Sequence, residues 1–193
     1  MHGRMLPFLL LTMLGIALAV RKMSWQAHSA LLAKETGPPS TDPACANPPM
    51  DQCSFYATCL ESRYHCGPDG YPLGYGRKYC QKFAGERSKL DPQGQKWMID
   101  TMHCLQLVLV PDAIDANSTT CDALKDQAFA SHAGCYVSNG FCTLGVHDWA
   151  AIIEIVGITT PFANWDALKA TMQAIAYCTG FYGHMAERGW GLF

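Results

Sequence analysis

Residues 80–142 read CQKFAGERSKLDPQGQKWMIDTMHCLQLVLVPDAIDANSTTCDALKDQAFASHAGCYVSNGFC. This stretch begins at Cys80 and ends at Cys142, and it contains two long amphipathic segments with almost no Pro or Gly inside them. The first follows Asp91-Pro92, where Asp91 can cap a helix and Pro92 suits its first position. The second follows Thr119-Thr120-Cys121-Asp122, a possible capping box. Both segments repeat apolar residues at helical spacing and carry cysteines there, namely Cys104, Cys121 and Cys135. We therefore expect disulfides between helices.

Helical spacing extends to the rest of the chain. It predicts helices over 51–64, 78–86 and 146–158, and from Asn164 to about Cys178. Turn residues predict loops over the glycine-rich residues 67–76 and over residues 111–119. A chain of 193 residues suits one domain. The predicted fold is all-α: a small disulfide-rich bundle of about five or six helices.

Ten cysteines form the clearest compositional signal. Their number is even and all follow residue 44, which predicts an oxidising compartment and five intrachain disulfides. Spacing alone leaves the connectivity open. Since no C-x-x-C pair is present, we expect no zinc or other metal site and no cofactor. The ten positions are Cys45, Cys53, Cys59, Cys66, Cys80, Cys104, Cys121, Cys135, Cys142 and Cys178.

The N-terminus has the pattern of a secretory signal. Residues 5–20 are almost wholly apolar, Arg4 precedes them, and Ala17-Leu18-Ala19 suits signal peptidase. We expect a signal peptide within residues 1–30, cleaved near 19–30, and a secreted protein. A retained anchor is the alternative, and only then is a membrane expected. Residues 31–50 are predicted to be a flexible leader, 51–180 the helical domain, and 181–193 a short aromatic and Gly-rich tail of open role.

The charge balance and a glycosylation sequon indicate which partners and which modification to expect at the surface. After residue 30 the chain has 11 basic and 16 acidic residues, a balance of −5, so nucleic acid is not an expected partner. Basic residues within 77–96 and acidic ones within 100–126 are interpreted as a solvated dipolar surface. Asn117-Ser118-Thr119 is a glycosylation sequon in a predicted loop, so we expect a glycan on Asn117.

One pair of residues raises the possibility of an enzyme. His147-Asp148, with the glycine-rich loop upstream, suggests a secreted phospholipase A2, which uses a His-Asp pair and a calcium loop. The loop lies some eighty positions away and no paired cysteines flank the His-Asp. Asp148 is better interpreted as a residue of a helix's first turn. We therefore expect no catalytic residue and no enzyme.

Several segments resemble the stanniocalcin family. They are Cys59-Leu60-Glu61, Gly70-Tyr71, Cys80-Gln81-Lys82-Phe83, residues 90–96 (LDPQGQK), Cys104, Cys121, Cys135-Tyr136 and Cys142. The cysteine gaps are also similar, with 23 residues between Cys80 and Cys104 and 35 between Cys142 and Cys178.

The resemblance implies a secreted, helical, hormone-like glycoprotein that regulates calcium and phosphate handling, or inhibits pappalysin-type metalloproteinases by binding them. It also implies the disulfides Cys45–Cys59, Cys53–Cys80, Cys66–Cys121, Cys104–Cys135 and Cys142–Cys178. Family members usually carry an eleventh cysteine that joins two subunits. This chain has ten, so we expect no covalent homodimer. The usual sequon after Cys-Leu-Glu is also missing, which indicates a distant member.

Three functional hypotheses follow. The first is a non-enzymatic regulator that binds a receptor, a metalloproteinase or an assembly subunit through its helical surface. The second is an extracellular or lumenal structural subunit kept by an N-terminal anchor. The third is the phospholipase-like enzyme.

Overall fold

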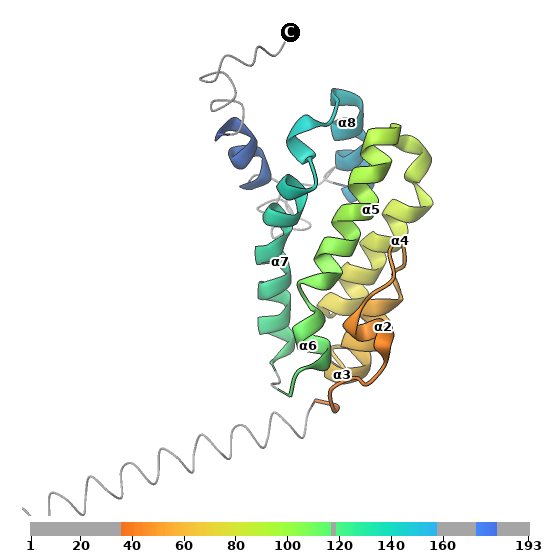
Figure 1. Cartoon of the computed structure of the whole chain (residues 1–193), viewed down its shortest axis with the longest axis vertical. Helices are drawn as coiled ribbons and strands as arrows, with labels where there is room; N and C mark the ends of the chain where they lie inside the picture. The colour runs from red at the N-terminus through yellow and green to blue at the C-terminus, as the bar shows by residue number, and fades with distance from the viewer. Residues whose placement is uncertain (1–35, 117–118, 158–172, 181–193) are drawn as a thin grey trace, which may run out of the picture.

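The fold is helical throughout the parts described. The computed structural model describes residues 36–116, 119–157 and 173–180, and none of these forms a strand. Five disulfides join cysteines of the chain. The all-α prediction (Figure 1) and the prediction of five intrachain disulfides are both confirmed.

The helices are shorter and more numerous than predicted. Two elements, η1 and η2, are π-helices, and two, η3 and η4, are 3₁₀ turns. Residues 173–180 are also helical. The labelled elements are α2 (Pro43–Ala46), η1 (Tyr56–Glu61), α3 (Ser62–Tyr64), η2 (Tyr71–Arg77), α4 (Lys78–Gly85), η3 (Arg87–Lys89), α5 (Pro92–Leu107), α6 (Val110–Ile114), α7 (Cys121–Ser138), η4 (Phe141–Thr143) and α8 (Val146–Val156).

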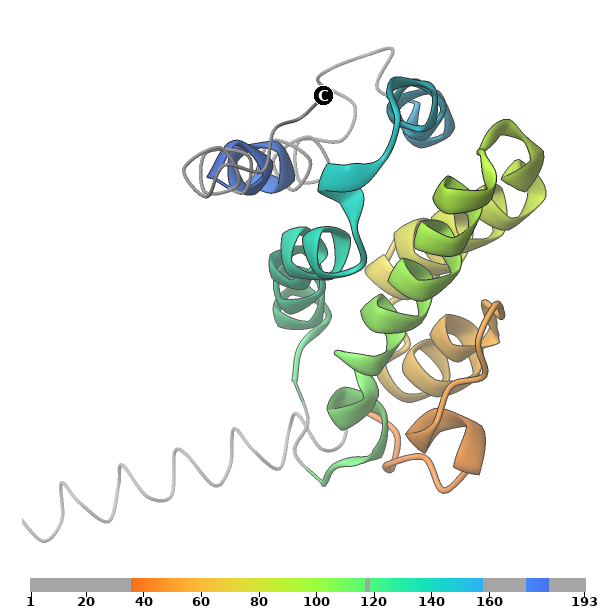
Figure 2. The same cartoon turned by 45° about the horizontal axis from the view of Figure 1, so that its top comes forward.

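Three helices form the body of the molecule. In Figure 1, α4 leads up to the turn η3, α5 descends beside it, and α7 rises again on the other side of α5. The short elements α2, α3 and α6 close the lower end, and α8 lies at the upper end (Figures 1 and 2). The core between them includes the fully buried Leu60, Met98, Leu109, Leu124 and Ile155.

Helix α5 begins where the sequence predicts, but its cap comes from elsewhere. Asp91 occupies the N-cap position, yet its side chain makes no capping hydrogen bond. The backbone N–H of Asp91 instead donates to Oδ1 of Asp148 at 2.8 Å, across 57 positions of sequence. Asp148 is only 1% exposed and lies against Gly94 in the first turn of α5. A side chain of α8 therefore closes the N-terminus of α5.

Helix α7 follows local signals more closely. The Thr120 side chain accepts a hydrogen bond from the Ala123 N–H at 3.2 Å, the cap typical of a threonine in this position. The helix ends before Gly140, whose φ of 98° is readily adopted by glycine.

Three local predictions are wrong. Residues 71–77, predicted as part of a glycine-rich loop, form the π-helix η2, because Tyr71 and Tyr75 anchor them in the aromatic core. Residues 110–114, partly predicted as loop, form α6. The helical segment predicted over 51–64 begins near residue 54. It does not begin at Asp51, because the φ of 60° at that residue is not helical.

The helical domain also begins earlier than residue 51. Cys45 in α2 is fully buried and bonded to Cys59. The N–H groups of Gly37 and Ser40 donate to the carbonyls of Arg63 and Ala113. Residues 36–50, assigned from sequence to a flexible leader, are thus packed against α3 and α6.

Some predictions concern parts of the chain that are not described. The signal segment, the Asn117 sequon, the helix start at Asn164 and the tail 181–193 lie outside the described residues. Among the helices that the structure does describe, none is both long and apolar enough to cross a membrane.

Candidate functional site

The disulfides hold the helices as one frame. They join Cys45 to Cys59, Cys53 to Cys80, Cys66 to Cys121, Cys104 to Cys135 and Cys142 to Cys178, the same pairs that the family resemblance implies. The third fastens the start of α7 to residues after α3, and the fourth joins α5 to α7 with Cα atoms 5.8 Å apart. No cysteine of the chain is free.

His147 and Asp148 make separate contacts. Both belong to the first turn of α8, where the sequence predicts a helix start. The Asp148 carboxylate accepts from the backbone of α5, whereas His147 Nδ1 lies 3.4 Å from Oδ2 of Asp91 on the surface. Their two side chains therefore serve different contacts, and Asp148 does not orient the imidazole as a catalytic aspartate would.

Asp91, His147 and Asp148 nevertheless form a compact group. One ligand-type atom from each lies within 4.8 Å of the others. Both carboxylates stand at helix N-termini, where the helix dipole stabilises a negative charge and opposes a cation. The Asp148 carboxylate accepts from the Asp91 N–H and the Asp91 carboxylate contacts His147, so these protein contacts account for the group and we assign no metal to it.

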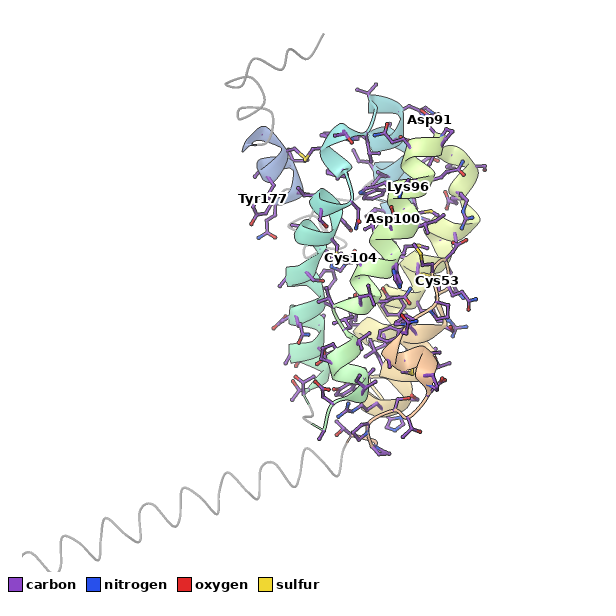
Figure 3. All side chains as sticks on the ribbon, viewed as in Figure 1. Cys53, Asp91, Lys96, Asp100, Cys104 and Tyr177 are labelled. Carbon is purple, nitrogen blue, oxygen red and sulfur yellow. A yellow bond between two sulfur atoms is a disulfide. The ribbon has the colours of Figure 1, made fainter. Side chains whose placement is uncertain are left out.

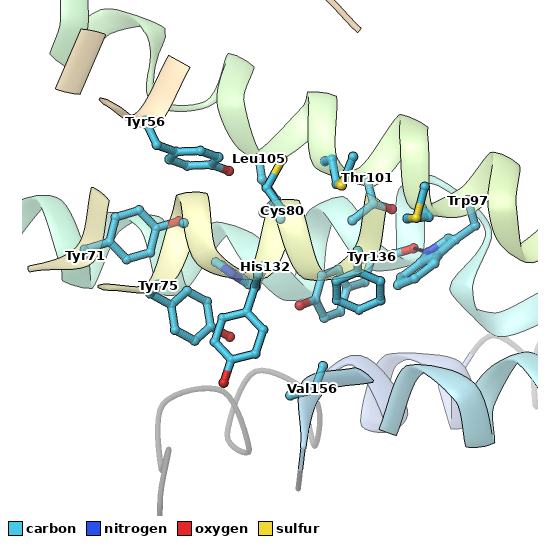
Figure 4. A pocket seen from close by; sticks show the side chains of 15 residues that line it. Tyr56, Tyr71, Tyr75, Cys80, Trp97, Thr101, Leu105, His132, Tyr136 and Val156 are labelled. Carbon is cyan, nitrogen blue, oxygen red and sulfur yellow. Dashed lines mark hydrogen bonds between the residues drawn. The ribbon is translucent and has the colours of Figure 1, made fainter. Parts of the chain in front are cut away.

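An aromatic cavity lies between η1, η2, α4, α5, α7 and α8. Figure 4 shows Tyr56, Tyr71 and Tyr75 at one end, Trp97 at the other, and His132 with Tyr136 between them. The centre of a water molecule can occupy about 50 Å³ of this space. Ring contacts continue around the wall: Tyr75 lies 4.6 Å from Phe129 and 5.9 Å from His132, centroid to centroid.

Burial controls the ionisation of the cavity residues. Desolvation raises the pKa of Tyr56, Tyr71 and Tyr136 above the usual value of a phenol, so all three stay protonated. Burial likewise lowers the pKa of His132 to about 4. The Nδ1–H of His132 donates to the Ala128 carbonyl at 2.6 Å, so Nε2 of the neutral ring is left as an acceptor.

Two conformational features shape this cavity. The π-helices η1 and η2, a rare helix type often found at functional sites, contribute Tyr56, Tyr71 and Tyr75. The Tyr56 ring also packs on Gly76, where an added Cβ would overlap the ring. Sequence reasoning missed Tyr71 and Tyr75 because residues 67–76 were predicted as a loop, whereas Tyr56 was placed in the predicted helix 51–64 without a role in a site. The high density of tyrosines over residues 56–79 is a sequence signal that could have indicated an aromatic cavity.

An exposed apolar patch lies at the C-terminal half of α5. We define the α5 patch as Met50, Leu107 and Val108, which are 51%, 43% and 37% exposed. Residues 48–52 are held along α5 because His103 Nε2 contacts the Pro48 carbonyl at 2.9 Å and Gln106 donates to the Gln52 carbonyl at 2.7 Å. Met50 lies between these two anchor points, which places it on the same side of the molecule as the end of α5. Figure 3 labels Cys104, which precedes Leu107 in α5, and Cys53, which directly follows residues 48–52.

The predicted dipolar surface is partly neutralised by ion pairs. Lys96 contacts Asp100 at 2.5 Å within α5, and Lys89 contacts Glu86 and Glu154. Arg87 pairs with Asp51. Such exposed pairs contribute little to stability, and they reduce the basic surface that a polyanion could use.

Comparisons with known proteins agree with the cysteine pattern. No match was found among the curated proteins or the solved structures. The sequence model described as the stanniocalcin family matches residues 38–179. That match spans well over half of the chain. The chain therefore belongs to the stanniocalcin family, whose members are secreted, hormone-like glycoproteins.

Proposed function

We propose that this protein is a secreted, non-enzymatic regulator that acts by binding a protein partner through the α5 patch. Membership in a hormone family is the observation that carries the proposal. Five disulfides support it, since they suit an oxidising compartment. The use of Asp148 as a helix cap supports the non-enzymatic assignment.

The α5 patch suits a protein partner for two reasons. It is built on a helix that Cys104–Cys135 fastens to α7 and beside a segment that Cys53–Cys80 fastens to α4. A patch held in this way loses little conformational freedom when it binds. It also exposes apolar and thioether side chains, and methionine is common in the centres of protein interfaces.

We propose a metalloproteinase of the pappalysin type as the partner and inhibition as the effect, with control of calcium and phosphate handling as the alternative. Every cysteine is already in an intrachain bridge, which supports action without an intersubunit disulfide. The N-terminal signal would be removed during export, and Asn117 would carry a glycan.

The test uses the full chain expressed in a secreting cell. N-terminal sequencing of protein from the medium should begin near residues 19–30, whereas an intact Met1 would favour the anchored subunit. The purified protein should inhibit a pappalysin-type proteinase in a peptide-cleavage assay. Leu107→Asp should weaken inhibition at least tenfold, as expected when a charge enters an apolar contact.

The matched control is Ile153→Asp on α8, where the isoleucine is 49% exposed but lies outside the α5 patch. It should leave inhibition unchanged. Equal loss of inhibition in both variants, with both correctly folded, would contradict the role of the patch.

A further inference from the structure

The aromatic cavity contains more hydrogen-bonding groups than the protein itself satisfies. Thr101 Oγ1 is buried and has no partner among the described residues. Tyr56, Tyr71 and Tyr136 bring three more hydroxyls to the same cavity, and Tyr56 and Tyr71 are only 2% and 4% exposed. Four hydroxyls therefore line one cavity, and the buried hydroxyl of Thr101 has no protein partner among the described residues.

These groups need a guest that can hydrogen-bond. Buried hydroxyls without partners are costly, and native proteins almost always satisfy them with protein, water or ligand. The neutral His132 ring adds an acceptor, because its Nδ1–H is already used. The cavity thus offers donors from the hydroxyls and an acceptor from Nε2, a combination that suits a group able both to donate and to accept.

The rest of the wall suits an aromatic body. Trp97, Tyr75 and Phe83 present ring surface to the cavity, and Val156 adds an aliphatic side chain from α8 (Figure 4). Aromatic side chains stabilise rings by offset-stacked and edge-to-face contacts. The centre of a water molecule can occupy about 50 Å³ of the cavity, so a bound molecule must be compact, one ring at most.

We propose that the aromatic cavity is a binding site for a small phenol-like molecule, one ring in size with a hydroxyl group. The hydroxyl donates to His132 Nε2 and accepts from the hydroxyls around it, while the ring lies among the aromatic side chains. This site is independent of the α5 patch, because none of the three patch residues lines the cavity. Its failure would leave the proposed function untouched.

The test compares matched pairs of probes on the purified full-length protein. Phenol is compared with benzene, 4-methylphenol with toluene, and 4-ethylphenol with ethylbenzene. Binding is measured by calorimetry and by the shift in unfolding temperature. We expect each hydroxyl compound to bind at least tenfold more tightly than its hydrocarbon partner. The shift in unfolding temperature should rise with the concentration of the phenol.

Variants then locate the site. Thr101→Val keeps the shape of the side chain, and Tyr136→Phe removes only a hydroxyl. Each should reduce the preference for the phenol about threefold to tenfold, while hydrocarbon binding stays the same. Tyr177→Phe is the control, because Tyr177 is 63% exposed on the helix 173–180. Circular dichroism and the unfolding temperature show whether each variant is folded.

Two results would overturn the proposal. One is the absence of binding by every probe up to its solubility limit, which would mean that the cavity holds water only. The other is equal affinity for the members of each pair, or an equal effect of Tyr177→Phe, which would mean that the cavity hydroxyls do not recognise the guest.

Discussion

Replacing Gly94 with alanine should destabilise this protein, although the same change stabilises most helices. Alanine is favoured over glycine within a helix by about 1 kcal/mol. In α5, however, an added Cβ at residue 94 would come closer than 3.0 Å to the carboxylate of Asp148, a separation that real Cβ atoms essentially never show. Asp148 is 1% exposed, so it cannot simply rotate into solvent.

The magnitude follows from what Asp148 would lose. Its hydrogen bond from the Asp91 N–H involves a charged acceptor, and such bonds contribute about 1.5 to 3 kcal/mol. Overpacking at a tight site adds about 1 to 3 kcal/mol. After subtracting the gain of about 1 kcal/mol in helix propensity, we expect Gly94→Ala to lower the free energy of unfolding by about 1.5 to 5 kcal/mol.

The assay is guanidinium unfolding with the disulfides intact, followed by far-ultraviolet circular dichroism. Gly134→Ala is the matched control, because Gly134 lies inside α7 and an added Cβ there meets nothing within 4 Å. It should raise the free energy of unfolding by about 0.5 to 1 kcal/mol. In an Asp148→Ala background, Gly94→Ala should no longer be costly. If Gly94→Ala alone stabilises the protein as Gly134→Ala does, the argument about the α5 cap is wrong.

Three further predictions concern other parts of the molecule. Burial lowers the pKa of His132 from 6.5 to about 4, so on acidification the unfolded chain binds a proton before the folded protein does. The free energy of unfolding should therefore be at its full value above pH 6.5 and fall by on the order of 3 kcal/mol as the pH drops to 4. Denaturant unfolding measured across this range should show a weaker dependence of the free energy of unfolding on pH for His132→Gln. Replacing both Cys104 and Cys135 with alanine opens a loop of 31 residues and should lower the free energy of unfolding by about 3 to 4 kcal/mol, and a variant as stable as the parent would contradict a structural role for this bridge. Asn117→Gln should remove the mass that a peptide N-glycosidase releases from the secreted protein, and an unchanged mass would show that the sequon is unused.

Local sequence signals account for the long helices and the class of fold. The cap at Thr120, the apolar spacing of α5 and α7 and the glycine after α7 act within a few residues, so they can be read without a structure. The even number of cysteines likewise predicts five bridges. Their pairing required the family resemblance, because spacing alone allows many connectivities.

The sites depended on contacts between distant segments. The Asp91 N–H at the start of α5 donates to Asp148, 57 positions away, and no residue near Asp91 in the sequence predicts this hydrogen bond. The segment 71–77 looks like a loop by its glycines, yet ring contacts from Tyr71 and Tyr75 to Phe129 hold it as a π-helix. Tertiary packing here overrides local propensity.

By itself, the sequence determined an all-helical, disulfide-bonded protein of a secreted family, because periodicity, capping and cysteine count are local or compositional properties. Only the tertiary structure decided that His147 and Asp148 serve helix ends, and that hydroxyls from η1, η2, α5 and α7 meet in one cavity. The physical reason is the same in both cases: the partner of each polar group is chosen by which segments the folded chain brings within hydrogen-bonding distance.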